Sequence, residues 1–424
     1  MIETVTIESL AGGRGHGVAH ASGITLFVPG TVPGDVVELD LTGAADRRRW
    51  LVLPALRLVH PSQHRIKPAC THACDSPEHV TEACGGCPWM NLSLEQQRVQ
   101  KLAIVSRAFS STRNPVKTPS EVSTAGPDLG YRCRTRMNAA GGHLGFFAPL
   151  SHRIVDVAAC LMVPRPELHN QLRPFLPAGV ASSRGSGSAE LRLLYGDDDR
   201  LHLTVDQALA ADFATLRDAV SGLAGVRLAG RESGFEGLPV DTPGFGPVTV
   251  SSAGFFQAGP HANGLILREI ERIMSGLDRP GPVLECYAGS GNLTRVLRQH
   301  ADVVAVESDP QSARFFGRNL RDHPGPGKVS LLQMSVEEAV RSRKITFSPR
   351  TIVLDPPREG IDKRANDALV ALAPRFVVLI SCDPMNGARD ATEWIRGGYE
   401  RLEFLVLDTM PHTQHFEIIQ VLHK

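Results

Sequence analysis

Two reactive side chains stand out late in the sequence, the thiol of Cys382 and the carboxylate of Glu417. Cys382 comes just after the apolar run FVVLI and before an Asp-Pro pair, which favours a turn that exposes the thiol. Glu417 ends the segment PHTQHFE, in which His415 also lies. A thiolate can add to an electrophilic carbon, and a carboxylate or imidazole can then remove a proton from the adduct. Because a lone buried cysteine is usually inert packing, the surroundings of Cys382 decide between the two interpretations.

The elements that must position these groups follow an alternating pattern. Seven apolar strands, separated by helical stretches, are expected in GPVLECYAG, ADVVAVESD, KVSLLQMS, TIVLDPPREG, FVVLISCDP, LEFLVLD and HFEIIQVL. This alternation predicts a doubly wound parallel sheet. Tyr287, Glu307, Asp355 and Cys382 all fall at or just after strand ends, which is the edge where open α/β sheets bind ligands.

A Gly-rich turn, ECYAGSG, follows the first of these strands and would let a ligand approach the backbone closely. Glu307, 16 residues after Gly291, ends the next strand, where its carboxylate can accept hydrogen bonds from ribose hydroxyls. NAD and S-adenosylmethionine both fit this pattern. Against NAD, the third glycine of its fingerprint is missing in GSGNLT. Glu307 could also be an ordinary helix cap.

The segment DPPREG indicates what the thiol could act on. Its two prolines fix a rigid corner that holds the Asp355 carboxylate at the strand end. Arg358 stands where methyltransferases of exocyclic amines favour an aromatic residue, and it suits a phosphate or a pyrimidine edge. Carbon 5 of uracil is a poor nucleophile, but thiolate addition at carbon 6 gives an enolate that can accept a sulfonium methyl group. A base must then remove the proton on carbon 5.

Four cysteines gather in a second region, at Cys70, Cys74, Cys84 and Cys87. The chain has eight cysteines and no secretory signal, so metal-binding or catalytic thiolates are expected rather than disulfides. Four thiolates suit zinc and an iron–sulfur cluster alike. The CxxxCxxC triad of radical enzymes is absent, which argues against reductive cleavage of S-adenosylmethionine.

The first 59 residues alternate in short segments between Gly-rich turns, which predicts a five-stranded nucleic-acid-binding barrel or a purely structural β module. A helix is expected over 93–110 and a loop over 114–128. In YRCRTRMN, Arg132, Arg134 and Arg136 alternate along an expected strand and would share one face, either for phosphates or simply solvated. Cys133 would point into the core.

The length and composition of the chain limit the number of domains and the kinds of partner to be expected. A length of 424 residues suggests about three domains, and 42% apolar residues are enough for each to bury a core. The 45 basic and 45 acidic residues balance, so nucleic-acid binding must come from local patches. No membrane helix or signal segment is expected, and the cytoplasm is the expected location.

These segments resemble the bacterial uracil-C5 RNA methyltransferases that carry an N-terminal TRAM domain and an iron–sulfur cluster. The resemblance covers nearly the whole chain. It is carried by FVPGTVPGDVVELDL, CGGC at Cys84–Cys87, VDVAAC ending at Cys160, GFFQ at Gly254–Gln257, ECYAGSGN, ESDP, LDPPREG, SCDP and PHTQHFE.

The resemblance implies a multidomain α/β protein and a set of site residues. It implies an OB-like TRAM β-barrel over 1–59, a central α+β iron–sulfur and RNA-binding domain over 60–250, and a Rossmann-like methyltransferase domain over 251–424. It implies Cys382 as nucleophile and Glu417 as base. The S-adenosylmethionine contacts would be Gln257, Tyr287, Asn292, Glu307 and Asp355. The [4Fe–4S] ligands would be Cys70, Cys84, Cys87 and Cys160, because RIKPAC favours Cys70 and leaves Cys74 as a spare thiol.

By the same resemblance, the enzyme would form 5-methyluridine in RNA, with 23S ribosomal RNA favoured over transfer RNA and a monomer as the acting species. The target base would leave its stack and enter a cleft between the sheet domain and the cysteine-bearing domain. Two other classes are alternatives, a non-catalytic RNA-binding or assembly protein and a methyltransferase of RNA or DNA amines. The first predicts loss of Cys382 or Glu417, and the second has no need of the thiol.

Overall fold

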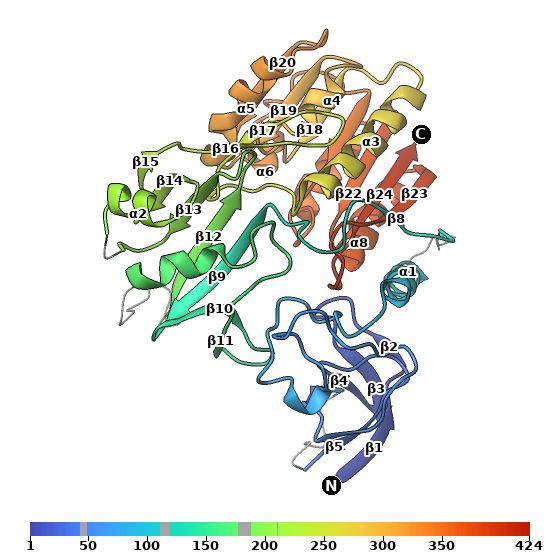
Figure 1. Cartoon of the computed structure of the whole chain (residues 1–424). Helices are drawn as coiled ribbons and strands as arrows, with labels where there is room; N and C mark the ends of the chain where they lie inside the picture. The colour runs from blue at the N-terminus through green and yellow to red at the C-terminus, as the bar shows by residue number, and fades with distance from the viewer. Residues whose placement is uncertain (43–48, 111–118, 177–187, 210) are drawn as a thin grey trace.

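The computed structural model describes residues 1–42, 49–110, 119–176, 188–209 and 211–424 (Figure 1). Within these ranges no helix has both the length and the apolar character needed to cross a membrane. Residues 114–118, part of the loop predicted from the sequence, lie outside the described ranges.

Residues 1–42 and 49–60 form two small sheets around one core, called here the N-terminal β unit. One sheet has the order β1 (Ile2–Thr6), β5 (Val36–Asp40), β7 (Arg57–His60), and the other β2 (Ser9–Leu10), β3 (Gly17–Ala21), β4 (Ile24–Val28), β6 (Trp50–Val52). Both sheets supply apolar residues to a shared cluster that includes Val5, Leu26 and Val37. The predicted all-β character is confirmed, with seven described strands where five were expected.

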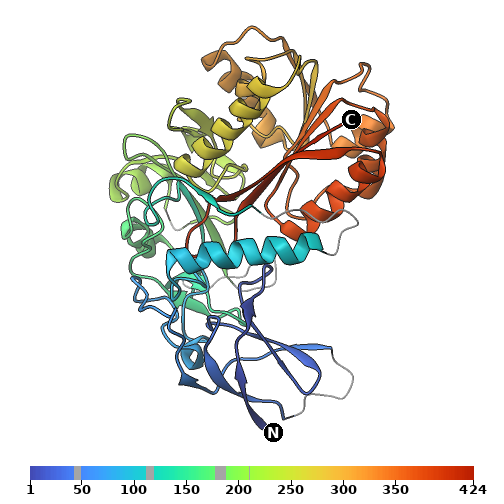
Figure 2. The same ribbon diagram turned by 90° about the vertical axis from the view of Figure 1, so that its right-hand side faces the viewer.

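A short helix η1 (Pro77–His79) and the long helix α1 (Leu94–Ser110) follow. Helix α1 confirms the helix predicted over 93–110. Figure 2 shows it lying across the molecule between the N-terminal β unit and the C-terminal part of the chain.

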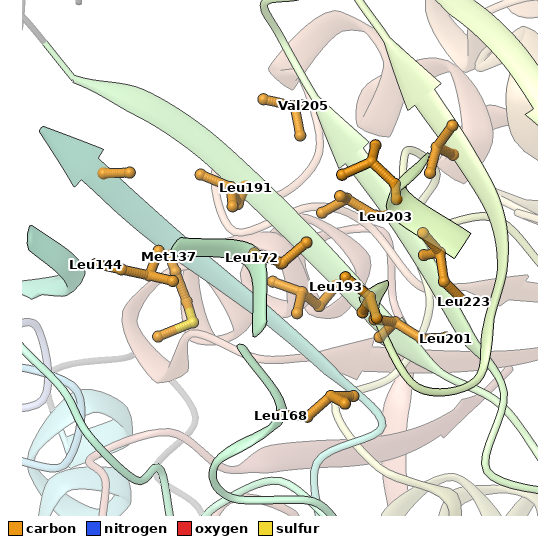
Figure 3. Close-up of a cluster of buried hydrophobic side chains, with 14 of the residues drawn as sticks. Met137, Leu144, Leu168, Leu172, Leu191, Leu193, Leu201, Leu203, Val205 and Leu223 are labelled. Carbon is orange, nitrogen blue, oxygen red and sulfur yellow. The ribbon is translucent and has the colours of Figure 1, made fainter. Parts of the chain in front are cut away.

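The central part is a seven-stranded sheet covered on one face. Its order is β11 (Ile154–Asp156), β10 (His143–Phe147), β9 (Arg134–Ala140), β12 (Ala189–Tyr195), β13 (Leu201–Val205), β14 (Leu223–Leu228), β15 (Arg231–Gly234). Helices η2 (Leu168–Phe175) and α2 (Phe213–Ala219) pack on it through a core that includes Met137, Leu172, Leu191 and Leu203 (Figure 3). A separate two-stranded sheet joins β16 (Leu238–Val240) to β17 (Val248–Val250).

The C-terminal part is an eight-stranded sheet that contains all seven predicted strands. Its order is β20 (Val329–Gln333), β19 (Val303–Glu307), β18 (Val283–Cys286), β21 (Thr351–Leu354), β22 (Phe376–Ser381), β24 (Glu417–His423), β23 (Glu400–Asp408), β8 (Ser123–Thr124). Its helices are α3 (Pro260–Gly276), α4 (Thr294–Leu297), α5 (Pro310–Asp322), α6 (Val336–Arg341), α7 (Lys363–Ala371) and α8 (Pro384–Arg396).

Two features of this sheet differ from the prediction of a wholly parallel sheet over 251–424. Strand β24 runs antiparallel to both β22 and β23, because a tight connection after β23 returns the chain directly into the sheet. Strand β8 pairs with the edge of β23 although it comes from the part of the chain predicted to be a loop.

Alternate residues of the buried strands face opposite helix layers. Val283, Val353 and Val378 lie in the cluster that includes α3 and α4, whereas Leu284, Ile352 and Val377 face the cluster that includes α6, α7 and α8. Burial on both faces explains why these strands read as continuous apolar runs. The chain turns to opposite sides of β18 to form β19 and β21, so a crevice opens beyond the carboxyl ends of these strands.

Candidate active site

The register between β22 and β24 sets Cys382 opposite Glu417. The antiparallel ladder pairs Phe376 with His423 and continues without a shift to Ser381 with Ile418. Cys382 and Glu417 are the next residues beyond this last pair, and the Glu417 carboxyl group lies near enough to the Cys382 thiol to raise its pKa. Residues opposite each other in such a ladder point to the same face. The structure therefore brings together the predicted nucleophile and the predicted base, which are 35 residues apart in the sequence.

Burial controls the ionisation of both groups. It raises the pKa of the Cys382 thiol to about 12, with the nearby Glu417 carboxyl adding to the rise and Arg358 opposing it. It also raises the pKa of Glu417 well above its usual range, with Asp355 adding to the rise and Arg358 again opposing it. One carboxylate oxygen of Glu417 is buried without a hydrogen-bond partner. Burial thus disfavours the charged form of both groups in the free protein, and Glu417 becomes a strong base once it ionises.

His415 is a weaker candidate for the base. Its ring nitrogens lie 3.3 and 3.4 Å from a guanidinium nitrogen of Arg358. Burial lowers the pKa of His415 to about 3, and the positive charges of Arg358, Arg132 and Lys101 add to the drop. An imidazole with so low a pKa accepts protons poorly at neutral pH. The geometry thus favours Glu417.

The Gly-rich turn after β18 is tied to the end of β19 through Glu307. One carboxylate oxygen of Glu307 accepts the Gly289 amide at 2.7 Å, and the other accepts the Asp309 amide at 2.6 Å. Gly289 has a positive φ of 57°, and a side chain there would meet nothing within 4 Å. Open space beside a glycine is what a ligand needs to approach the backbone. Tyr287 also adopts a positive φ, 65°, which is uncommon for a residue with a side chain.

Three carboxyl groups surround this turn. Burial raises the pKa of Asp355 to about 7. It raises the pKa of Glu285 to about 8, although the Thr294 hydroxyl donates to Glu285 at 2.6 Å, and the charges of Asp355 and Glu307 add to the rise. A cationic ligand would favour the charged forms of these buried carboxyl groups, whereas the two phosphates of a dinucleotide would oppose them. Glu285 was not predicted, and its position inside an apolar strand was the available signal.

Gln257 and Asn292, two further site residues predicted from the sequence, differ from each other in their contacts. The segment Gly254–Gln257 lies against the start of α5, where a side chain at Gly254 would be 3.7 Å from the Ser312 hydroxyl. The Gln257 carbonyl accepts a hydrogen bond from the Cys133 thiol at 3.6 Å, and the residue is half-buried. The Asn292 amide instead exchanges hydrogen bonds of 2.6 and 3.0 Å with Asn263. Asn292 thus already has a structural partner.

The arginine segment is only partly as predicted. Strand β9 begins at Arg134, so Arg132 precedes it and the expected shared face of three arginines is wrong. Arg134 donates to the carbonyls of Phe256 and Gly254, which holds the Gly254–Gln257 segment. Arg136 is exposed and pairs with Glu190 at 3.7 Å. Cys133 is buried in the core, as predicted.

Arg132 lies at a cavity of cysteines. Cys70, Cys84, Cys87 and Cys160 line one common cavity together with Arg132 and apolar side chains that include Met90 and Leu161. Burial raises the pKa values of Cys84, Cys87 and Cys160. Among the residues described, no group of three or more ligands is arranged around a single metal ion. Cys74 points elsewhere, because its thiol packs with Val80 and Ala83 and donates to the Ser76 carbonyl at 3.2 Å.

A larger cavity of about 380 Å³ connects all three parts of the chain. The charged or titratable side chains at its rim, apart from cysteines, are those of Arg14 and His16 from the N-terminal β unit, Arg132, Arg358 and His415. No aspartate or glutamate is among the described residues that line it. The cavity therefore presents the guanidinium groups of three arginines, and one of them, Arg358, also acts on the charges of Cys382 and Glu417.

Comparisons with known proteins agree with this geometry. The sequence model of the tRNA (Uracil-5-)-methyltransferase family matches residues 253–424. A 23S rRNA (uracil(1939)-C(5))-methyltransferase of Yersinia enterocolitica is 30% identical, over 98% of this chain and 93% of its own. One of Halomonas elongata is 31% identical, over 96% and 87%. The structure of Pyrococcus abyssi tRNA (uracil-54, C5)-methyltransferase with S-adenosyl-L-homocysteine has a TM-score of 0.74 at 20% identity and covers 99% of both chains, which shows a shared fold.

Burial and Glu417 raise the pKa of Cys382 whereas Arg358 lowers it, which gives a prediction for the reactivity of the thiol. Alkylation of Cys382 by iodoacetamide should become faster from pH 7 to pH 10 without a plateau, because its pKa of about 12 lies above this range. Arg358→Gln removes the charge that lowers this pKa, so the variant should react more slowly at each pH, by roughly tenfold per pKa unit. Peptide mass spectrometry measures the rate. Arg364→Gln, at an exposed arginine of α7, is the control, and equal rates in both variants would contradict the assignment.

Proposed function

The chain belongs to the RNA uracil-C5 methyltransferase family, and on this premise we propose that Cys382 is its nucleophile and Glu417 its base. As a member of this family it is an enzyme that transfers a methyl group from S-adenosylmethionine to carbon 5 of uracil in RNA. The observation that carries the residue assignment is the register of β22 and β24, which ends one residue before Cys382 and Glu417 and so sets the thiol beside the carboxyl group.

The reaction then runs in three steps. The Cys382 thiolate adds to carbon 6 of uracil, and the electron pair of the 5,6 double bond moves into an enolate. Carbon 5 of the enolate takes the methyl group, and the sulfonium leaves as the neutral thioether S-adenosylhomocysteine. Glu417 removes the proton from carbon 5, the double bond reforms, and the Cys382 thiolate leaves carbon 6.

The bound methyl donor supplies the charge that this chemistry needs. Burial disfavours the charged forms of both groups of the catalytic pair in the free protein, and the nearby Asp355 carboxyl group adds to this effect. A sulfonium near Asp355 would place a fixed positive charge close to both groups. The positive sulfonium favours ionisation of the thiol, so the nucleophile becomes active when the methyl donor is present.

For the methyl donor we propose Gln257, Tyr287, Glu307 and Asp355 as contacts. Glu307 holds the Gly-rich turn through one carboxylate oxygen, accepts the Asp309 amide with the other, and still has lone pairs that can accept ribose hydroxyls. The three carboxyl groups around the turn suit a ligand with a net positive charge. Asn292 is a weaker proposal, since its amide already bonds Asn263.

For RNA we propose the 380 Å³ cavity between the N-terminal β unit, the cysteine segment and the sheet. Its cationic rim suits phosphates, and the N-terminal β unit, which we propose is a TRAM domain, would bind flanking nucleotides. The target base must leave its stack to reach Cys382. We favour 23S ribosomal RNA because the two relatives named above act on it, with transfer RNA as the alternative.

We propose that Cys70, Cys84, Cys87 and Cys160 hold a [4Fe–4S] cluster in the cysteine cavity. Four thiols around one apolar cavity are the ligand set of such a cluster, and the Gly86 amide donates to the Cys84 sulfur at 3.4 Å. The cationic Arg132 lies beside Cys87 and Cys160 and would balance negative charge there. The cluster would supply a covalent link between the cysteine loop and β11 and so stabilise this part of the RNA cleft.

The nucleophile is tested with 5-fluorouracil-substituted RNA. Fluorine at carbon 5 cannot leave as a proton does, so the methylated adduct should accumulate and survive denaturation. Enzyme, S-adenosylmethionine and substituted 23S rRNA or tRNA are mixed, and the adduct is mapped by mass spectrometry. An adduct on Cys382 is expected with ribosomal RNA. If neither RNA gives an adduct with folded, cluster-loaded protein, the thiol assignment is wrong.

The base is tested with Glu417→Gln and ordinary RNA. The variant retains shape and hydrogen-bonding atoms but cannot take the proton, so turnover should fall by roughly 10²–10⁴-fold. The methylated covalent complex should build up and be visible on a denaturing gel. His415→Gln is the matched variant, and accumulation in that protein instead would assign the proton transfer to His415.

The cluster ligands are tested by metal and sulfide analysis of anaerobically purified protein. Cys70→Ser should lose most of the iron and the visible cluster absorbance, because three thiolates remain in the cavity. Cys74→Ser should retain both, since that thiol faces Val80 and Ala83. If only the Cys74 variant loses iron, Cys74 is the cluster ligand and Cys70 is not. Zinc without sulfide in the wild-type protein would replace the cluster proposal.

A further inference from the structure

The loop that leads into the base is held by a distant helix. Residues 409–416 connect β23 to β24 and end immediately before Glu417. Two polar side chains of α1, Gln97 and Lys101, contact this loop although both have 0% of their surface exposed. They are four residues apart and so lie on the same face of the helix. Figure 2 shows α1 crossing between the N-terminal β unit and the C-terminal strands.

Lys101 fixes the start of the loop. Its ammonium group donates to Asp408 at 2.5 Å and to the Met410 carbonyl at 3.2 Å. Asp408 is only 2% exposed, so both charges are buried. Removing two charges from water costs about as much as their attraction returns, so such a pair does more to fix geometry than to add stability.

Gln97 fixes the middle of the loop. Its side-chain nitrogen donates to the carbonyls of Leu92 at 2.7 Å and Trp89 at 3.0 Å, which orients the amide. The side-chain oxygen therefore faces the loop, where it accepts the His412 amide at 2.7 Å. The Trp89 amide donates to the His412 carbonyl at 3.1 Å. His412 has a positive φ of 64°, a strained conformation that persists only where neighbours hold it.

We propose that Gln97 and Lys101 are positioning residues that set the Glu417 carboxyl group against Cys382. Neither residue lines the 380 Å³ cavity, and both act through their contacts with Asp408 and the loop backbone. The proposal rests on Glu417 as the base. Since Glu417 acts only after methyl transfer, a displaced loop should slow the release of the covalent adduct and leave its formation nearly unchanged. A merely structural contribution would slow both steps together.

The experiment follows adduct formation and decay in a single turnover. It uses the full-length, cluster-loaded enzyme with S-adenosylmethionine and the unsubstituted form of the RNA that gives the 5-fluorouracil adduct. Gln97→Met removes the acceptor for His412, and the double variant Lys101→Met/Asp408→Leu removes both buried charges together. Adduct formation should stay within about twofold of wild type, whereas decay should slow by roughly 10- to 100-fold, as expected for a small misplacement of a catalytic group.

One control and one further variant separate positioning from folding. Gln100→Leu alters the contact of α1 with the Leu10 amide of the N-terminal β unit, 3.3 Å away, and should leave adduct decay unchanged. Gln97→Glu is close in size to glutamine but loses the nitrogen that donates to the Leu92 and Trp89 carbonyls, so it should slow decay as Gln97→Met does. If Gln97→Met does not fold, the double variant and Gln97→Glu still test whether the contacts of α1 with the loop position Glu417.

The outcomes distinguish a failure of the positioning proposal from a failure of the assignment of Glu417 as the base. Wild-type decay in both test variants, or equal slowing of formation and decay, overturns the positioning assignment. Glu417→Gln is measured in parallel. If that variant also fails to accumulate the adduct, the assignment of the base is wrong and the positioning inference falls with it. If Glu417→Gln accumulates adduct and the α1 variants do not, only the positioning inference is wrong.

Discussion

The antiparallel register of β22 and β24 is the constraint on which the site depends. A slip of one residue would turn every side chain of β24 to the other face of the sheet and carry Glu417 away from Cys382. The register is protected by burial on both faces, because Ile418, Ile419 and Val421 all lie in packed cores. The geometry of the reacting pair is therefore set by the same apolar contacts that stabilise the sheet.

Two electrostatic regions meet at this pair. On one side, Glu285, Glu307 and Asp355 surround the Gly-rich turn with carboxyl groups. On the other side, the cavity toward the N-terminal β unit has arginines and histidines at its rim. A cationic methyl donor and an anionic nucleic acid thus have separate approaches that end at Cys382. This division agrees with the overall charge balance of the chain, since each region is local.

The sequence was sufficient for the C-terminal sheet and for the positions of its reactive residues. Long apolar strands with chemistry at their ends form a strong local pattern, and Cys382 and Glu307 follow directly from it. The contacts that depend on tertiary packing were not predictable. Gln97 and Lys101 look like surface residues of an amphipathic helix, and their burial depends on a loop more than 300 residues away. Arg132 seemed part of a strand face, but β9 begins two residues later.

The place of β24 between β22 and β23 has a consequence for the order of folding. Strand β23 precedes β24 in the chain yet lies outside it, so β23 cannot reach the sheet until β24 is inserted. The two strands form a local hairpin, which is favoured to assemble early and then dock as a unit against β22. Docking of the hairpin adds β24 and β23 to the sheet and, in the same step, brings the Glu417 carboxyl group beside the Cys382 thiol. A partly folded molecule can thus expose the cysteine, but it lacks the group that would release a trapped RNA.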